Sequence, residues 1–237
     1  MRIAPMMDFP IEEYETRMSN LVAKLDEADC DAVLLTNEEN LRYFCGYRSA
    51  AWNSEYEYPA MMLVARSGKI ALVTSTRRLP GALATACVEE TEILAFDGFG
   101  EQATPGVFAP SIVQALQQLG VTSGKLGTET GLVARMRIAY SDYQALFALM
   151  PDMQAMDFAK YIFDLREIKS PREIEVMRKC CAMAVDAFKV GMDKLVLGST
   201  TEEEMYHEYV AACFDMGADD FEYQLIVEFG PDRPQPN

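Results

Sequence analysis

Histidine is nearly absent from the sequence, which holds a single one, His207, among 237 residues. Metal-dependent hydrolysis usually joins an imidazole to several carboxylates, and serine or cysteine triads need an imidazole as their base. His207 precedes Glu208, but no second histidine completes an H-E-x-x-H helix, so we interpret it as part of a solvated helix face. We interpret Asp219, Asp220 and Glu222 as acids of a turn or a sheet edge rather than as a metal site. The sequence therefore predicts no catalytic residue and no metal ligand in this chain.

Positive charge, long apolar runs and paired cysteine motifs are also scarce. Lys and Arg number 21 against 37 Asp and Glu, and the net charge of -16 disfavours nucleic acids and anionic membrane surfaces as partners. No apolar run approaches the ~18 residues that span a bilayer, and the N-terminus lacks the apolar core of a signal peptide. The six cysteines form no C-x-x-C motif and most lie in apolar segments, which is typical of reduced, buried thiols. We expect a cytoplasmic protein with no nucleic-acid and no membrane partner.

The sequence does contain enough apolar residues for a packed core. Hydrophobic residues make up 50% and charged residues 24% of the chain, as in globular proteins, which excludes a disordered chain. A length of 237 residues is long for one average domain and short for two, at about 150 residues per domain. We expect one complete domain followed by part of another.

The amino-terminal part alternates between predicted strands and predicted helices. Thr36 and Glu39 form a capping box that starts a short helix, which ends at Gly46. An R-S-G-K turn around Gly68 joins two strands into an antiparallel hairpin, and Ser141 caps the last helix. The predicted helices are 11–28, 36–46, 110–119 and 141–150, and the predicted strands are 31–36, 59–65, 70–74, 91–96 and 125–129. This order predicts a three-layer, mixed-sheet α/β domain.

A long amphipathic helix is predicted after a boundary near residues 165–170. Ser170 is its cap, Pro171 its first residue and Glu173 the partner in a capping box. Thr200 and Glu203 form a second capping box, which starts another helix, and residues 223–227 are predicted as a strand. The long helix carries an apolar stripe that must pack on another element: Ile174, Met177, Cys181, Ala184, Phe188, Met192 and Leu195. The face that the next helix is predicted to bury holds Tyr206, Val210, Cys213 and Gly217.

Two groups of motifs together carry a family resemblance. From Lys169 to Gly217 the order is I-K-S-P-x-E-I-x-x-M-R, a long helix, G-x-T-x-x-E and a second helix, followed by G-A-D and G-P. Upstream, D-A-V-L-L-T-N-E-E-N-L-R-Y-F-C-G-Y contains an N-x-x-Y-x-x-G-Y pattern. In this combination the chain resembles the creatinase, prolidase and aminopeptidase P family. The resemblance implies a creatinase-type N-terminal domain at residues 1–163 and an incomplete α+β pita-bread catalytic domain at residues 164–237.

The resemblance also implies a function for the family. Its members are metal-dependent hydrolases in which two Asp, a His and two Glu hold two divalent ions, such as Mn, Co, Zn or Fe, and all five ligands follow the segment present here. By that resemblance, this chain is the N-terminal portion of such a hydrolase, it binds no metal itself, and it is inactive alone. The expected substrate of the full-length protein is a dipeptide or another small molecule.

The loop Arg48–Tyr58, R-S-A-A-W-N-S-E-Y-E-Y, gathers aromatic and charged residues between two predicted elements. Such side chains on a loop give contact area and orientation for ligand recognition, or they pack on their own domain. In relatives this region reaches across a homodimer interface and caps the neighbouring active site. The resemblance therefore implies that Trp52, Glu55 and Tyr56 contact a substrate in the partner subunit, with Arg48 as a ligand for a carboxylate.

The final segment, G-P-D-R-P-Q-P-N, leaves other functions open. Asn237 stands where peptidase members of the family have a His in G-P-N-x-x-x-P-H, so the resemblance also admits creatinase-like hydrolases and dimethylsulfoniopropionate lyases. A non-catalytic dimerisation or binding module is the alternative from a different class. A strand at residues 223–227 without later partners would be an exposed sheet edge, which favours the hydrolase portion over the module.

Overall fold

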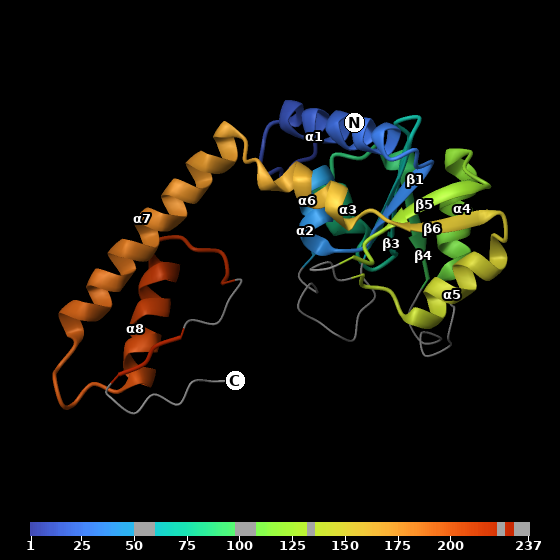
Figure 1. Ribbon diagram of the computed structural model, residues 1–237. Helices are drawn as coiled ribbons and strands as arrows, with labels where there is room; N and C mark the ends of the chain where they lie inside the picture. Colours follow the sequence, from blue (N-terminus) through green and yellow to red (C-terminus); the bar gives the residue numbers. More distant parts are fainter. Residues whose placement is uncertain (50–59, 98–107, 132–135, 222–225, 230–237) are drawn as a thin grey trace. The chain divides into compact units, whose positions relative to one another are not determined.

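The computed structural model describes residues 1–49, 60–97, 108–131, 136–221 and 226–229 (Figure 1). The chain divides into two compact units, Met1–Ile168 and Lys169–Asn237. The boundary predicted between residues 163 and 164 falls inside α6 (Ala159–Glu167), the last helix of the first unit. Among the helices in the described ranges, none combines the length and the apolar character that crossing a bilayer requires.

The first unit is built on one mixed sheet (Figure 1). Its strands are β1 (Ala32–Leu35), β2 (Met61–Ala65), β3 (Ile70–Ser75), β4 (Ile93–Phe96), β5 (Gly124–Thr128) and β6 (Met153–Asp157), in the spatial order β4-β3-β2-β1-β5-β6. Strand β2 pairs antiparallel with β1 and β3, and the pairs β3–β4, β1–β5 and β5–β6 are parallel. The predicted hairpin between β2 and β3 is confirmed, and Gly68 in its turn has a φ of 85°.

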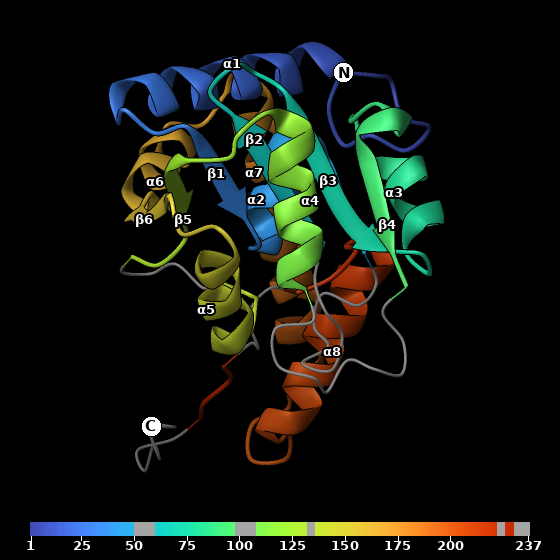
Figure 2. The same cartoon turned by 90° about the vertical axis from the view of Figure 1, so that its right-hand side faces the viewer.

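Helices cover both faces of the sheet (Figure 2). On one face lie α1 (Ile11–Glu27), α2 (Glu38–Cys45), α3 (Leu79–Thr85) and α6, and on the other lie α4 (Ala109–Leu119) and α5 (Tyr140–Leu149). Successive strand residues point to opposite faces, so Val33 and Leu35 of β1 join the first core and Ala32 and Leu34 join the second. The predicted three-layer, mixed-sheet α/β fold is confirmed.

The predicted starts of two helices are wrong. The N-cap of α2 is Asn37, whose side chain accepts a hydrogen bond from the Glu39 N–H at 3.1 Å. The Thr36 hydroxyl has other partners: it donates to the Glu129 carboxylate at 3.0 Å, and its oxygen accepts the Arg137 backbone N–H at 2.9 Å. Helix α5 begins at Tyr140 with no side-chain cap, in place of the predicted serine cap.

Three elements of the first unit are not predicted from the sequence. Helix α3 has the sequence L-P-G-A-L-A-T, in which Pro and Gly both disfavour a helix. Strand β6, M-Q-A-M-D, lies at the edge of the sheet and is mostly exposed, so it lacks the apolar run of a buried strand. Helix α6 lies across the predicted domain boundary, where a connection is expected instead.

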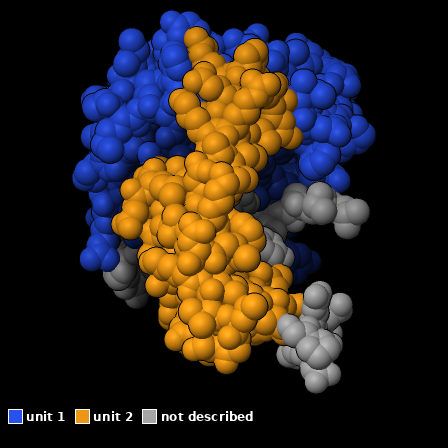
Figure 3. Space-filling view, turned by 90° about the vertical axis from the view of Figure 1, so that its left-hand side faces the viewer, with its two compact units in different colours: residues 1–168 blue, residues 169–237 orange. Residues whose placement is uncertain are grey.

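The described residues of the second unit, which is orange in Figure 3, form two helices that pack on each other, α7 (Pro171–Lys194) and α8 (Glu202–Asp215). The predicted capping box of α7 is confirmed, because the Ser170 N–H donates to Glu173 Oε2 at 2.9 Å and the Glu173 N–H donates to Ser170 Oγ at 3.2 Å. The capping box of α8 is one residue later than predicted and joins Thr201 with Glu204. Of the strand predicted at 223–227, residues 223–225 lie outside the described residues, and Ile226–Phe229 belong to no strand.

Small side chains, and not the predicted apolar stripe, bring α7 and α8 together. Ala187 and Gly191 are the buried residues of α7, and a Cβ at Gly191 would lie 2.7 Å from the terminal methyl carbon of Met205 on α8. Helix α8 buries Met205, Ala212 and Cys213, so Cys213 alone is correct in the predicted face.

The predicted stripe of α7 is largely exposed within the second unit. Met177 and Phe188 are 51% and 52% exposed, and Ile174 and Met192 are also exposed. Cys181 of the stripe and its neighbour Cys180 are exposed too, so the prediction of buried thiols is wrong for these two and correct for the other four cysteines. The stripe is therefore an apolar surface that α8 leaves uncovered.

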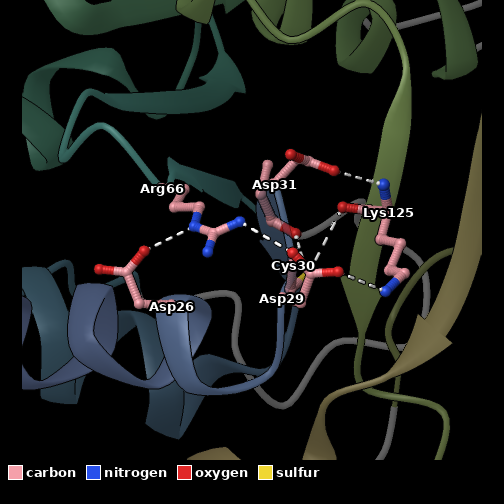
Figure 4. A network of polar contacts seen from close by, with 7 residues as sticks. Asp26, Asp29, Cys30, Asp31, Arg66 and Lys125 are labelled. Carbon is pink, nitrogen blue, oxygen red and sulfur yellow. Dashed lines mark hydrogen bonds and ion pairs between the residues drawn. The ribbon is translucent and has the colours of Figure 1, made fainter.

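Charged side chains form an exposed network at the amino end of β1 (Figure 4). Arg66 donates to Asp26 Oδ1 at 2.5 Å and to Asp29 Oδ1 at 3.1 Å, and Lys125 Nζ donates to Asp29 Oδ2 at 2.9 Å. Exposed ion pairs contribute only about 0–1 kcal/mol each. The Asp31 carboxylate, which is half-buried, accepts the Lys125 backbone N–H at 2.7 Å and thereby joins the starts of β1 and β5.

Gly124 gives a direct test of this contact between β1 and β5. Its φ is 102°, and a Cβ there would lie 2.0 Å from Asp31 Oδ2, so the carboxylate would have to leave the Lys125 amide. We expect Gly124→Ala to lower the free energy of unfolding by about 2–4 kcal/mol in urea denaturation followed by circular dichroism. Gly120→Ala is the matched control, because Gly120 has a φ of 79° with nothing within 4 Å of its Cβ position. We expect that variant to lose about 1 kcal/mol. Equal losses in the two variants would contradict the role of Asp31.

Candidate functional site

Five strands end at one edge of the sheet, which we call the carboxyl edge. Strands β1, β5 and β6 run parallel, and β3 and β4 run in the same direction because β2 is antiparallel to both of its neighbours. In open α/β sheets, ligands bind outside the carboxyl ends of adjacent strands whose connections leave toward opposite faces. Here β1 leads to α2 on one face and β5 leads to α5 on the other. The carboxyl ends of β1 and β5 are therefore the candidate site.

The strand that follows the predicted substrate loop, β2, starts at the carboxyl edge. Its first residue is Met61, which pairs with Val73 near the end of β3. Three of the four predicted substrate-binding residues, Trp52, Glu55 and Tyr56, lie outside the described residues. Their contact with a substrate stays a prediction.

Arg48 is described, and its side chain belongs to an ion pair. Its Nη1 donates to Asp8 Oδ1 at 3.3 Å, and Asp8 also accepts from Arg42 Nε at 2.7 Å. The Arg48 backbone N–H donates to Thr85 Oγ1 at 3.0 Å, which ties the start of the loop to α3. The Arg48 side chain is 38% exposed, so a substrate carboxylate would compete with Asp8 for it.

Glu129 follows β5 and places a buried carboxylate between the ends of β1 and β5. The residue is 1% exposed. Its Oε2 accepts from the backbone N–H groups of Thr36 at 2.6 Å and Asn37 at 2.8 Å, and from the Thr36 hydroxyl at 3.0 Å. Its Oε1 accepts from the Asn40 side-chain amide. Four donors therefore surround this single carboxylate.

Glu38 lies beside this group, in the first turn of α2. Its Oε2 accepts from Arg137 Nη1 at 2.7 Å, and its Oε1 has no hydrogen-bond partner among the described residues. The Arg137 backbone N–H donates to Thr36 Oγ1 at 2.9 Å, so Arg137 contacts the Glu38 carboxylate directly and the Glu129 carboxylate only through Thr36.

Burial controls the protonation of these two carboxyl groups. Burial raises the pKa of Glu38 to about 8, against the lowering effect of Arg137. Burial also raises the pKa of Glu129, while its hydrogen bonds from Thr36, Asn40 and Asn37 act in the opposite direction. All four contacts of Glu129 are donors, which is the arrangement that a carboxylate needs.

Sequence reasoning misses this cluster, although a signal for it exists. Glu129 follows the strand K-L-G-T, where a charged side chain at the end of a buried strand calls for a partner. Asn40 is the first residue of the N-x-x-Y pattern, which carries the family resemblance but by itself indicates no partner for the Asn40 side chain. The donors of the cluster come from residues about ninety positions away, and spacing in the sequence does not reveal them.

The acidic groups near the end of the chain form no metal site in the described residues. His207 is exposed, and the neighbouring Glu208 pairs with Lys194. Asp220 accepts the N–H of Phe221 at 2.7 Å within its own turn. Across the described ranges, no three His, Cys, Asp or Glu side chains are grouped so that they could hold a metal ion.

Comparison with known proteins gives one family match and a set of longer relatives. A family model described as the creatinase/prolidase N-terminal domain matches residues 17–168. An uncharacterized peptidase of Staphylococcus aureus (strain bovine RF122 / ET3-1) is 24% identical over 222 residues, which are 94% of this chain and 56% of that protein. The uncharacterized peptidase of strain MW2 matches with the same identity and coverage. The chain thus spans about half the length of the curated relatives it matches.

Solved structures show the same fold at low sequence identity. The Xaa-Pro dipeptidase from Bacillus anthracis has a TM-score of 0.65 at 21% identity, covering 87% of this chain and 50% of that chain. The prolidase from Pyrococcus furiosus has a TM-score of 0.65 at 20% identity, covering 85% and 54%. The prolidase from Thermococcus sibiricus has a TM-score of 0.70 at 15% identity, covering 89% and 52%. These matches extend beyond residue 168 into the second unit, because each covers more of the chain than the first unit alone.

The raised pKa of Glu38 predicts a pH dependence of stability. The folded protein holds this proton up to pH about 8, whereas the carboxyl has an ordinary pKa of 4.5 in the unfolded chain. Its contribution to the free energy of unfolding is therefore fully present below pH 4.5 and is lost as the pH rises toward 8. We expect Glu38→Gln to gain stability relative to the native protein between pH 5 and pH 8.5, on the order of 1–3 kcal/mol.

Urea denaturation at a series of pH values measures this difference. Glu39→Gln is the control, because Glu39 is the exposed neighbour in the same helical turn and shares the effect of a lost charge near the helix start. A stability difference between Glu38→Gln and the native protein that stayed constant over this pH range would show that Glu38 ionises normally.

Proposed function

The chain belongs to the creatinase/prolidase N-terminal domain family, and from this premise we propose that it is the N-terminal portion of a metal-dependent hydrolase of the Xaa-Pro peptidase and creatinase group. Its part is to dimerise and to supply a loop that caps the substrate of a partner subunit. The observation that carries the proposal is the family match over residues 17–168, which coincides with the first compact unit. The full hydrolase acts on a dipeptide or a similar small molecule.

The second unit supports the presence of further structure in the working hydrolase. Met177 and Phe188 of α7 are about half exposed, and a groove of about 580 Å³ lies between α7, α8 and residues 226–229. Large exposed apolar patches are usually covered by another protein surface, since burying them is favourable by about 25 cal/mol per Å². We assign the covering surface to the remainder of the catalytic domain.

The capping loop is proposed from its composition and from the position of its ends. The described residues beside the loop are Arg48, whose backbone N–H donates to Thr85 of α3, and Met61, with which β2 starts at the carboxyl edge. Trp52 and Tyr56 offer flat apolar surfaces to a bound substrate, and Glu55 offers a negative charge to a substrate ammonium group. Arg48 is the group for a substrate carboxylate, which would exchange with Asp8.

The metals belong to the part of the hydrolase outside this chain. A pair of divalent ions, Mn, Co, Zn or Fe, would supply an activated water for hydrolysis. Since the described residues contain no group that could hold such an ion, no step of the reaction is assigned to a metal on this chain.

Asn237 favours a second candidate within the same family. Peptidase members have a His at the place of this residue, so Asn237 leaves room for the creatinase-like or dimethylsulfoniopropionate lyase-like branch. A non-catalytic dimerisation module remains the alternative of a different class, and it shares the loop and the dimer but requires no catalytic remainder.

We expect the purified chain to form a dimer without metal-dependent activity. Calorimetric titration with Mn²⁺ should show no tight binding, and Xaa-Pro dipeptides should not be hydrolysed with Mn²⁺ or Co²⁺ present. Sedimentation equilibrium should give twice the 26.5 kDa of one chain. Turnover that depended on a tightly bound metal would contradict the proposal that the metals bind outside this chain. A mass of 26.5 kDa at all concentrations would contradict dimerisation.

The loop can be tested in the same sedimentation experiment. Trp52→Ala should weaken the dimer about tenfold or more, because buried tryptophans contribute strongly to interfaces. Tyr140→Ala is the control, since Tyr140 is an aromatic residue of the first unit that is 71% exposed on α5. Equal dissociation constants for the two variants would show that the loop does not contribute to the dimer interface.

A further inference from the structure

We propose that the Glu129 carboxylate is a built-in anionic ligand of the sheet, and that through Asn40 it holds the C-terminal end of α6. The carboxylate fills the place at the ends of β1 and β5 where a separate anion would bind. The inference concerns the first unit alone, so it does not depend on the proposed hydrolase function.

The position of Glu129 is the one where an α/β sheet offers donors to a ligand. The backbone N–H groups of Thr36 and Asn37 lie at the start of α2, and the N-terminal end of a helix favours a negative charge. A free carboxylate at this point would accept the same hydrogen bonds that Glu129 accepts. Because the chain supplies this anion itself and buries it to 1% exposure, the place is already filled.

The two side-chain donors are fixed in orientation by their other partners. The Thr36 hydroxyl oxygen accepts from the Arg137 backbone N–H at 2.9 Å, which leaves its own proton for Glu129. The Asn40 carbonyl oxygen accepts from Arg166 Nη1 at 2.8 Å, which turns the Asn40 NH₂ group toward Glu129. Each of the two donors is therefore oriented toward Glu129 by a hydrogen bond from a third residue, as a preorganised anion site requires.

The same contacts reach the last turn of α6. Arg166 contacts Asn40, and the Tyr43 hydroxyl donates to the Leu165 carbonyl oxygen at 3.1 Å. The last four carbonyls of a helix lack partners within the helix, so the bond from Tyr43 satisfies one of them. Both Asn40 and Tyr43 of the N-x-x-Y pattern thus attach to the final turn of α6, just before the first unit ends at Ile168. We call this arrangement the α6 clamp.

The clamp makes the order of the α6 end depend on the charge of Glu129, which directly follows β5. Without the Glu129 carboxylate, the Asn40 amide keeps only one of the two hydrogen bonds that fix its orientation, and it becomes a less fixed acceptor for Arg166. Removal of the Glu129 side chain should also open a site for a small carboxylate such as formate or acetate. These two consequences distinguish an anion site from a side chain that merely fills space.

Hydrogen exchange measured by mass spectrometry on peptides that cover Leu165–Ile168 tests the clamp. We expect Glu129→Ala to speed exchange there about tenfold to a hundredfold, because a hydrogen bond to a charged group is lost. Sodium formate or acetate should slow this exchange again and raise the Tm of Glu129→Ala by about 2–4 °C relative to sodium chloride at equal ionic strength. The native protein and Glu39→Ala should show no such response to the anion.

Two further variants keep the proposal testable if Glu129→Ala does not fold. Glu129→Gln preserves the shape without the charge, and it should speed exchange at the α6 end without rescue by formate, because the place stays filled. Arg166→Met should speed exchange at the same peptides while all the donors to Glu129 remain. Native exchange at the α6 end in both variants would overturn the clamp, and faster exchange in Glu129→Ala with no effect of formate or acetate would overturn the anion site.

Discussion

The carboxylate of Glu129 is the charge around which the carboxyl edge of the first unit is arranged. Removing such a group from water costs several kcal/mol unless hydrogen bonds replace its hydration. Two backbone N–H groups, a hydroxyl and an amide replace it here, and they come from Thr36, Asn37 and Asn40. The same contacts reach the start of α2, because Asn37, whose N–H donates to Glu129, is also the N-cap of this helix. Glu129 also fixes Asn40 against Arg166, so one buried charge connects β1, α2, β5 and α6.

The two ends of the sheet differ in the burial of their charged side chains. At the amino end of β1, Arg66 and Lys125 form exposed ion pairs that contribute little to stability. At the carboxyl edge, Glu129 is buried and Glu38 is mostly buried, and burial raises the pKa of both. Perturbed carboxyl groups are more frequent at functional positions than elsewhere. Strand β2, which follows the proposed substrate loop, starts at this same edge.

Local interactions account for the parts of the structure that the sequence predicts correctly. The capping box of Ser170 and Glu173 spans four consecutive residues, so its partners are visible in the sequence. Thr36 and Glu39 have the same spacing, yet the hydroxyl of Thr36 is taken by Glu129, a residue 93 positions away. The buried face of α7 also depends on a partner from another element. Gly191 leaves room for Met205 of α8, and no pattern within α7 shows which helix it contacts.

The candidate site is less predictable than the fold for a related reason. The charge of Arg48 within a loop predicts a carboxylate ligand, but its ion pair with Asp8 depends on how the N-terminal segment lies against α3. Glu129, Asn40 and Arg166 come from three separate elements, and their contacts exist only once the sheet is assembled. Trp52, Glu55 and Tyr56 lie outside the described residues, so their role rests on loop composition and family resemblance.

The central claim is that Glu129 is an ionised carboxylate held by four donors in the folded protein. Carbon-13 NMR of the protein labelled at glutamate side-chain carboxyl carbons measures this directly, with the Glu129 signal assigned from its loss in Glu129→Gln. The account predicts the chemical shift of a carboxylate at pH 7, with protonation only at lower pH, and an exposed reference in Glu39. A Glu129 signal with the chemical shift of a protonated carboxyl group at pH 7 would contradict the account.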